Sequence, residues 1–207
     1  MLVTGIKSKP VYAPLQADTR GRYHLMLGMG VGAAPLLRVI DEMRMAVTQA
    51  LPNTRVLYVP DAGAAHAGAA EIERFRTAAV GDVQAFPGTP ALLEEFRSTL
   101  GKSLMGTRLY VGGPESFIGL VMKIALEFNL NKDEIRAEEC GTLARRVYCI
   151  HCRATTENVR TNIVRCVACD RWLLVRDHYS RRLAAYMGVM VDAEAPGELP
   201  PLKEVFL

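Results

Sequence analysis

The chain has 207 residues, of which 50% are hydrophobic and 23% are charged, and its formal net charge is +3. This composition supports one large or two small hydrophobic cores and excludes a disordered or collagen-like chain. No apolar run approaches the roughly 20 residues that a membrane helix needs. Residues 1–14 lack the apolar segment of a secretory signal, so we expect a cytoplasmic protein with no membrane partner.

Positive charge is concentrated in the second part of the chain. Residues 145–182 contain nine arginines and three acidic residues, a net charge of +6, so the rest of the chain carries −3. We expect a domain boundary where the composition changes. The expected parts are an α/β domain over residues 1–144 and a metal-binding domain with a partner-docking tail over residues 145–207.

The first part of the chain alternates short apolar runs with segments of helical periodicity. The expected strands cover residues 23–27, 55–60, 82–86, 107–111 and 134–138. The expected helices cover residues 36–47, 71–76, 90–100 and 115–128. Such alternation with short connections predicts a parallel sheet with helices on both faces.

Glycine-rich turns follow two of the expected strands, at residues 28–32 and 112–114. Glycines at such turns let backbone N–H groups and a helix N-terminus approach a phosphate closely. They also permit tight packing of a strand against a helix without any ligand. The spacing alone does not decide between these two roles.

The two turns together resemble the landmarks of the pyridine-nucleotide module of ferredoxin reductases, and residues 135–139 resemble its closing strand. The resemblance covers residues 23–140 and implies a ferredoxin-reductase-like fold. It also implies a dinucleotide site formed by Gly28, Gly30, Gly32, Gly112, Gly113 and Pro114.

The chain departs from that family at several positions. Only residues 1–22 precede the first expected strand, where the family has a flavin-binding barrel, so a flavin has no expected site here. Gly112 stands where the family usually has a cysteine, and Ala34 where it has threonine or serine. Residues 61–65 lack the serine and arginine that contact the adenosine phosphate, and we expect His66 to be a surface residue. These departures argue against NAD(P) binding.

Four cysteines form the most specific motif of the sequence. Cys149 and Cys152 form one C-x-x-C pair, and Cys166 and Cys169 form a second; thirteen residues separate the two pairs. This spacing lets two turns face each other so that four thiolates surround one metal ion tetrahedrally. Cys140 lies outside the spacing, and we expect it to be an ordinary thiol.

The identity of the metal stays open between zinc and iron. Redox-active iron sites of the rubredoxin type commonly have a glycine after each second cysteine, where backbone N–H groups then approach the sulfurs. Here Arg153 and Asp170 occupy those positions, which favours a closed zinc site with a folding role over an iron site. We expect His151 to face outward, because four sulfurs already complete a tetrahedron.

Beyond the second pair, residues 171–175 predict a strand whose Trp172 covers the metal core. An Asp-His-x-Ser run follows, but its members are too close in sequence to act as a catalytic triad. We interpret residues 176–189 as an anchor, or alternatively as a solvated turn. The residues expected to make polar contacts are Asp177, His178, Arg181 and Arg182, and those expected to dock on a neighbour are Leu183, Tyr186 and Met187.

Residues 149–189 resemble the C-terminal domain of the DmmA-like subunits of dimethylamine monooxygenase. The order is the same: two C-x-x-C pairs, a tryptophan strand, then D-H-Y-S-R-R-L-x-A-Y-M-G-V. The resemblance implies a non-haem subunit of an NADPH-dependent assembly that demethylates dimethylamine to methylamine and formaldehyde. It further implies partner subunits that carry the haem and a flavin plus iron–sulfur reductase.

Three roles are compatible with these features. The subunit could be a structural docking component, or its metal could relay single electrons between the reductase and the haem. As a third role, from another class, the arginine-rich metal ribbon could bind nucleic acid. The segment has no lysine and few aromatic residues, which disfavours that role. We find no constellation typical of a free-standing enzyme.

Overall fold

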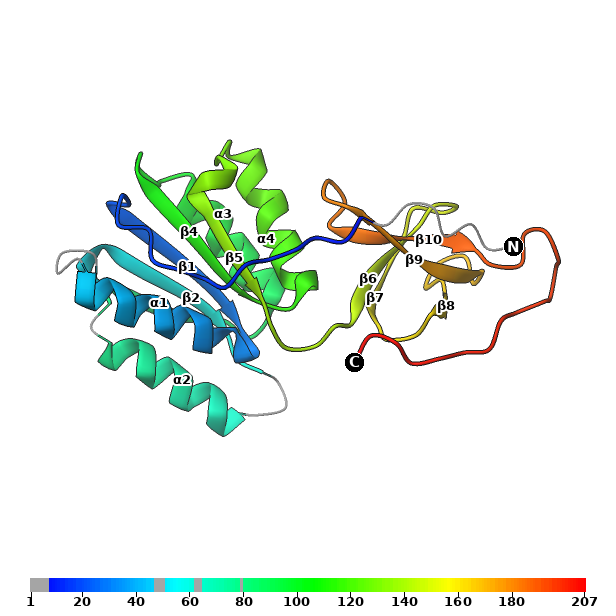
Figure 1. Cartoon of the computed structure of the whole chain (residues 1–207), viewed down its shortest axis with the longest axis horizontal. Coiled ribbons are helices and arrows are strands. Elements are labelled where there is room, and N and C mark those ends of the chain that lie inside the picture. The colour runs from blue at the N-terminus through cyan, green and yellow to red at the C-terminus, as the bar shows by residue number, and fades with distance from the viewer. Residues whose placement is uncertain (1–7, 47–50, 62–64, 79) are drawn as a thin grey trace. The chain divides into compact units, whose positions relative to one another are not determined.

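The computed structural model describes residues 8–46, 51–61, 65–78 and 80–207 (Figure 1). Two compact units are present, one of residues 12–141 and one in which residues 8–11 join residues 142–207. The second unit therefore begins close to the expected boundary at residue 145. Whether the units are independent folding domains stays a prediction. Within the described residues, no helix is long and apolar enough to cross a membrane.

The first unit is built on a five-stranded parallel sheet. Its strands are β1 (Tyr23–Met29), β2 (Thr54–Val59), β3 (Asp82–Ala85), β4 (Thr107–Gly113) and β5 (Ile135–Glu139), in the order β3-β2-β1-β4-β5. The strand order reverses direction between β1 and β4, as in doubly wound dinucleotide-binding folds. The expected parallel α/β fold is confirmed.

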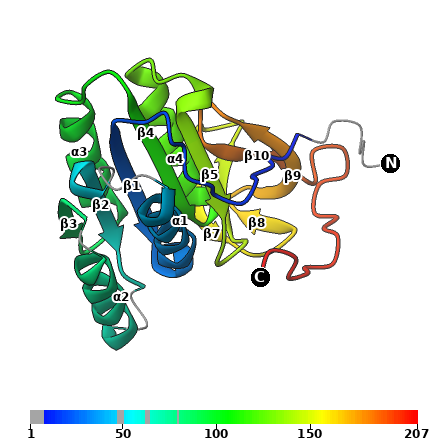
Figure 2. The same cartoon turned by 60° about the vertical axis from the view of Figure 1, so that its left-hand side comes forward.

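Helices cover both faces of this sheet (Figure 2). They are α1 (Ala33–Ala46), α2 (Ala65–Thr77), α3 (Thr89–Leu100) and α4 (Glu115–Glu127), with short 3-10 turns at Gly30–Gly32, Leu51–Asn53 and Lys132–Glu134. Successive residues of β1 serve opposite faces: Met26 packs in the core beneath α1 and α2, and Leu27 in the core beneath α3 and α4. Residue 47, the expected end of the first helix, lies outside the described residues.

An N-terminal segment crosses the β5 edge of the sheet. Tyr12 packs against the core on one face, and Leu15 is buried in the core on the other. Beyond it, Asp18 is buried and forms ion pairs with three arginines: Arg20, Arg108 and Arg136. Hydrogen bonds from Arg20 hold the pKa of Asp18 far below its usual range. The segment is thereby fastened to β4 and β5.

The second unit contains a five-stranded, mostly antiparallel sheet. Its strands are β6 (Arg145–Cys149), β7 (Thr155–Val159), β8 (Ile163–Arg165), β9 (Trp172–Ser180) and β10 (Ala185–Met190), in the order β7-β6-β10-β9-β8. Only the pairing of β6 with β10 is parallel. The N-terminal segment also joins this sheet, since Ser8 forms an isolated bridge with His178.

The predicted docking tail is in fact a hairpin of the second unit. β9 continues to Ser180, and β10 folds back against it through an antiparallel pairing. Tyr186, expected to dock on a neighbour, is 5% exposed and packs in the core of its own unit. Asp177 accepts a hydrogen bond from Arg145 at 2.7 Å, so its carboxylate is used within the chain. The anchor interpretation is therefore wrong for Tyr186, whereas Asp177 makes a polar contact as expected, with Arg145 of its own unit.

The last residues of the chain are held by a buried arginine. The Arg145 guanidinium lies 3.9 Å from the ring centroid of Tyr186 and 3.8 Å from that of Phe206. The end of the chain is also held by backbone hydrogen bonds from Val205 N and Phe206 N to Arg160 O. Cation–π stacking on both faces compensates the burial of this guanidinium.

We predict that Asp18→Asn lowers the free energy of unfolding of the first unit by about 2–3 kcal/mol, because three arginines lose their shared carboxylate. Because the pKa of Asp18 is lowered by folding, its stabilising effect is complete above a pH of about 4 and declines below it. Urea unfolding of the wild type and of Asp18→Asn checks this prediction. The difference between their free energies of unfolding should become smaller as the pH falls below about 4.

Asp41→Asn is the matched control, since the Asp41 side chain is 66% exposed in its pair with Arg44. It should change the stability by less than about 0.5 kcal/mol. Equal effects of the two substitutions would contradict the role assigned to Asp18.

Candidate metal centre

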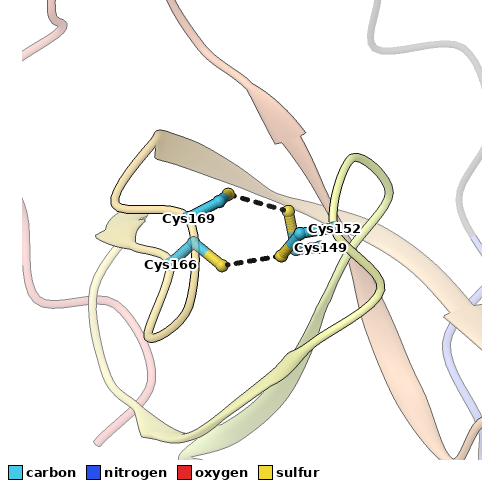
Figure 3. A group of neighbouring side chains, drawn as sticks. All are labelled: Cys149, Cys152, Cys166 and Cys169. Atoms are coloured by element: carbon cyan, nitrogen blue, oxygen red, sulfur yellow. Dashed lines mark hydrogen bonds between the residues drawn. The ribbon is translucent and has the colours of Figure 1, made fainter.

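The four cysteine sulfurs converge between two knuckles of the second unit (Figure 3). All four lie within 4.8 Å of one another. The Cys149 and Cys169 sulfurs are 3.8 Å apart, and those of Cys152 and Cys166 are 3.4 Å apart. A tetrahedron with metal–sulfur bonds of about 2.3 Å has sulfur–sulfur edges of about 3.8 Å. The residues therefore fit one tetrahedral metal ion, and the predicted four-cysteine cluster is confirmed.

The two knuckles have the same backbone pattern. In the first, Arg153 N donates to Cys149 O at 2.9 Å, and in the second, Asp170 N donates to Cys166 O at 3.1 Å. Arg153 and Asp170 both adopt left-handed conformations, with φ of +68° and +56°. A non-glycine residue in this conformation costs roughly 1–2 kcal/mol. Formation of the metal site compensates this cost.

The first knuckle is fixed to the sheet by its own strand. Cys149 ends β6 and is buried, and Ile150 N donates to Gly188 O of β10 at 3.1 Å. The second knuckle lies between β8 and β9, where Cys166 N donates to Arg171 O at 2.9 Å. The first cysteine of each pair is thus buried, whereas the second cysteine of each pair is half-buried. One side of the centre faces solvent.

Backbone N–H groups favour thiolates at this solvent-facing side. A backbone hydrogen bond from Arg171, supported by the neighbouring thiols and the Arg171 side chain, lowers the pKa of Cys169 to about 6. The lowered pKa favours the thiolate, which is the form that binds a metal ion. At Cys152 a backbone hydrogen bond from Ala154 also favours the thiolate, but burial and hydrogen bonds with the other three cysteines raise the pKa of its thiol overall.

The other residues expected near the centre lie outside the ligand set. His151 is exposed and its Nδ1 accepts a hydrogen bond from Arg171 at 2.9 Å, so it faces outward as predicted. Trp172 is only half-buried and carries the Arg165 guanidinium 5.3 Å from its ring centroid, so the expected burial over the metal core is wrong. Cys140 belongs to the first unit, where burial raises the pKa of its thiol.

The two glycine turns of the first unit lie against each other. A Cβ atom on Gly32 would lie 2.0 Å from Gly112 O, and one on Gly112 would lie 2.5 Å from Gly32 O. A Cβ atom on Gly28 would lie 2.9 Å from Leu36 Cδ1 and 3.0 Å from Tyr58 Cδ2. Close packing therefore accounts for these three glycines without a ligand. The sequence could not show this contact, because the turns are far apart along the chain.

Acidic side chains surround the edge where a dinucleotide would bind. The Asp61 carboxylate lies close to Gly30, and Tyr58 contacts both Gly30 O and the Glu71 carboxylate. Glu115 places a carboxylate in the first turn of α4, where a phosphate would otherwise be favoured. The described residues that directly follow the five strands include no lysine or arginine. The described residues thus place carboxylates beside the glycine turns.

Comparison with known families and curated proteins identifies the same two parts. The model described as dimethylamine monooxygenase subunit DmmA-like, N-terminal domain, matches residues 4–135, and the corresponding C-terminal domain model matches residues 146–189. The heme-dependent oxidative N-demethylase delta subunit of Ectopseudomonas mendocina is 33% identical over 111 residues. The match covers 54% of this chain and 63% of that protein, less than two thirds of its length.

Solved structures similar to the chain include reductases. Phthalate dioxygenase reductase has a TM-score of 0.47 and 18% identity, over 69% of this chain and 45% of that one. The ferredoxin reductase of carbazole 1,9a-dioxygenase has a TM-score of 0.40 and 17% identity, over 60% and 34%. Similarity at this level supports no conclusion about function.

We predict that Cys149→Ser or Cys166→Ser abolishes metal binding and unfolds the second unit, because the metal ion supplies much of its folding free energy. Metal analysis would show the loss of the ion. Hydrogen exchange, measured separately for the two units, would show that the second unit loses its protection while the first unit keeps it. Cys140→Ser is the matched control and should keep both the metal and the fold. Full metal content in Cys166→Ser would contradict the assignment of the ligands.

We also predict that the chain binds NADPH with a dissociation constant weaker than about 1 mM, because carboxylates rather than basic groups surround the glycine turns. Isothermal titration calorimetry with NADPH checks this. Micromolar binding would show that the turns hold a dinucleotide despite the adjacent carboxylates.

Proposed function

Because the chain belongs to the DmmA-like family of dimethylamine monooxygenase subunits, we propose that it is a non-catalytic subunit of a multicomponent, haem-dependent N-demethylase. In this proposal the assembly oxidises dimethylamine to methylamine and formaldehyde with electrons from NADPH. The haem lies on one partner subunit, and the flavin and iron–sulfur cluster lie on a reductase subunit. This chain holds those partners together.

The closed four-thiolate centre is the observation that best supports a docking role. Four protein sulfurs complete a tetrahedral site and leave no position for a substrate or water, which is typical of structural zinc. Arg153 and Asp170 occupy the left-handed positions that glycine holds in rubredoxin-type iron sites. We therefore propose zinc as the bound metal. The centre then shapes a surface of the subunit rather than reacting.

A second role is favoured by the exposure of the centre. Cys152 and Cys169 are half-buried, so a partner could approach these two sulfurs closely. Iron bound by four thiolates supplies one-electron chemistry. In that alternative this chain would hold the relay between the reductase and the haem subunit.

The acidic edge of the first unit supports assigning NADPH to the reductase partner. In the proposed assembly the first unit keeps the fold of a nucleotide module but serves as a scaffold. Unpaired thiolates that bind a metal also suit the reducing cytoplasm, where we propose the protein acts.

The exposure of the aromatic side chains argues against a nucleic-acid role. Single-stranded nucleic acids are bound by exposed rings on which bases stack. Three aromatic residues of the basic segment, Tyr148, Trp172 and Tyr179, and the nearby Tyr186 are buried or half-buried. We predict no gel shift of DNA or RNA by the full chain at low salt. A shift that is lost at high salt would instead favour a nucleic-acid partner.

The docking role predicts that the purified remaining subunits turn over dimethylamine slowly. Adding the full chain should raise NADPH-dependent formaldehyde formation at least about tenfold, because joint binding raises the effective concentration of reductase and haem subunit. Cys166→Ser should fail to restore it, whereas Cys140→Ser should restore it. Full turnover without this chain would contradict the proposal.

A further inference from the structure

The solvent-facing side of the metal centre has an unusual composition. We define the knuckle face as Ile150, His151, Arg153, Val167, Ala168 and Arg171. Ile150 is 53% exposed and Val167 is 72% exposed. They directly follow the first cysteine of each knuckle, and the knuckles share one hydrogen-bond pattern. Two branched apolar side chains are thus presented at equivalent positions beside the half-buried sulfurs.

A hydrogen bond connects the two knuckles on this side. Arg171 donates to His151 Nδ1 at 2.9 Å, and its side chain also contacts Cys169. Neither apolar residue is needed to cover the core, which is formed by other residues such as Val147 and Leu173. A single exposed apolar residue is ordinary, but a pair on adjacent, mutually bonded turns is typical of a binding surface.

The knuckle face carries two arginines, Arg153 and Arg171, and no acidic residue. The three acidic residues of segment 145–182 are each paired within the chain: Glu157 with Arg146, Asp170 with Arg165 and Asp177 with Arg145. These pairs involve three of the nine arginines, and the other six are Arg153, Arg160, Arg171, Arg176, Arg181 and Arg182. Four thiolates and a divalent ion add −2 to the segment's +6, so a net +4 remains.

The choice of arginine over lysine also indicates an interface. The segment contains nine arginines and no lysine. Arginine and large apolar residues are enriched at protein interfaces, whereas lysine is depleted there. A purely solvated surface has no such preference.

We propose that the knuckle face is the docking surface for an acidic surface patch of another subunit of the oxygenase, a patch of carboxylates around an apolar centre. Ile150 and Val167 enter the apolar centre of that patch, and Arg153 pairs with a carboxylate at its rim. The inference rests on the proposed function and names the surface through which it acts. Its occupant is a protein, because the charge of the segment is accompanied by exposed apolar rather than aromatic side chains.

The test measures binding of the full chain to the purified oxygenase assembly that lacks it. Val167→Glu introduces a negative charge at the centre of the knuckle face and should weaken binding at least about tenfold. Met105→Glu is the matched control, since Met105 is 95% exposed in the first unit. It should leave the affinity unchanged.

Arg153→Gly separates binding from folding. Glycine suits the φ of +68° at this position, so the variant should keep its metal and be at least as stable as the wild type. Its affinity should nevertheless fall, and the affinity should depend less on salt than that of the wild type.

The outcomes distinguish the two proposals. Wild-type affinity in both Val167→Glu and Arg153→Gly, with metal content unchanged, would overturn the docking surface and leave the proposed function standing. No binding of the wild-type chain to the assembly would overturn the proposed function and, with it, this inference. If Met105→Glu loses as much binding affinity as Val167→Glu, the docking surface is also overturned, because the effect is then not confined to the knuckle face.

Discussion

The convergence of four thiolates on one site is the constraint on which the second unit depends. Its buried apolar cluster has only seven members, and two of them are the ligands Cys149 and Cys166. So small a core cannot by itself offset the conformational entropy of two knuckles and a five-stranded sheet. The site also fixes two left-handed residues and presents Ile150 and Val167 to solvent. We therefore expect the second unit to fold only as it binds the metal, and the bound metal to fix the shape of the exposed surface.

In the first unit the two glycine turns pack closely against each other, and carboxylates lie beside them. Gly32 and Gly112 are required because the two turns touch, whatever else binds there. Asp61 and Glu115 lie where an anionic ligand would need positive charge or free helix N–H groups. The close packing of the two turns therefore does not depend on a bound dinucleotide.

Much of this architecture could be predicted from the sequence because its signals are local. Hydrophobic periodicity located the five strands and four helices of the first unit, and cysteine spacing located the metal ligands. The hairpin of β9 and β10 was missed, because β9 is half-buried along most of its length and shows no clear alternation. The contacts of Ser8, Asp18 and Phe206 join segments distant in sequence, and no local pattern predicts them.

Metal analysis combined with a visible spectrum of protein purified without chelator or nickel tests the central claim most directly. A structural centre that shapes a docking surface predicts one equivalent of zinc per chain and no visible absorption, because Zn²⁺ has a filled d shell. One equivalent of iron, with charge-transfer bands that bleach on reduction, would contradict it and make the centre an electron relay.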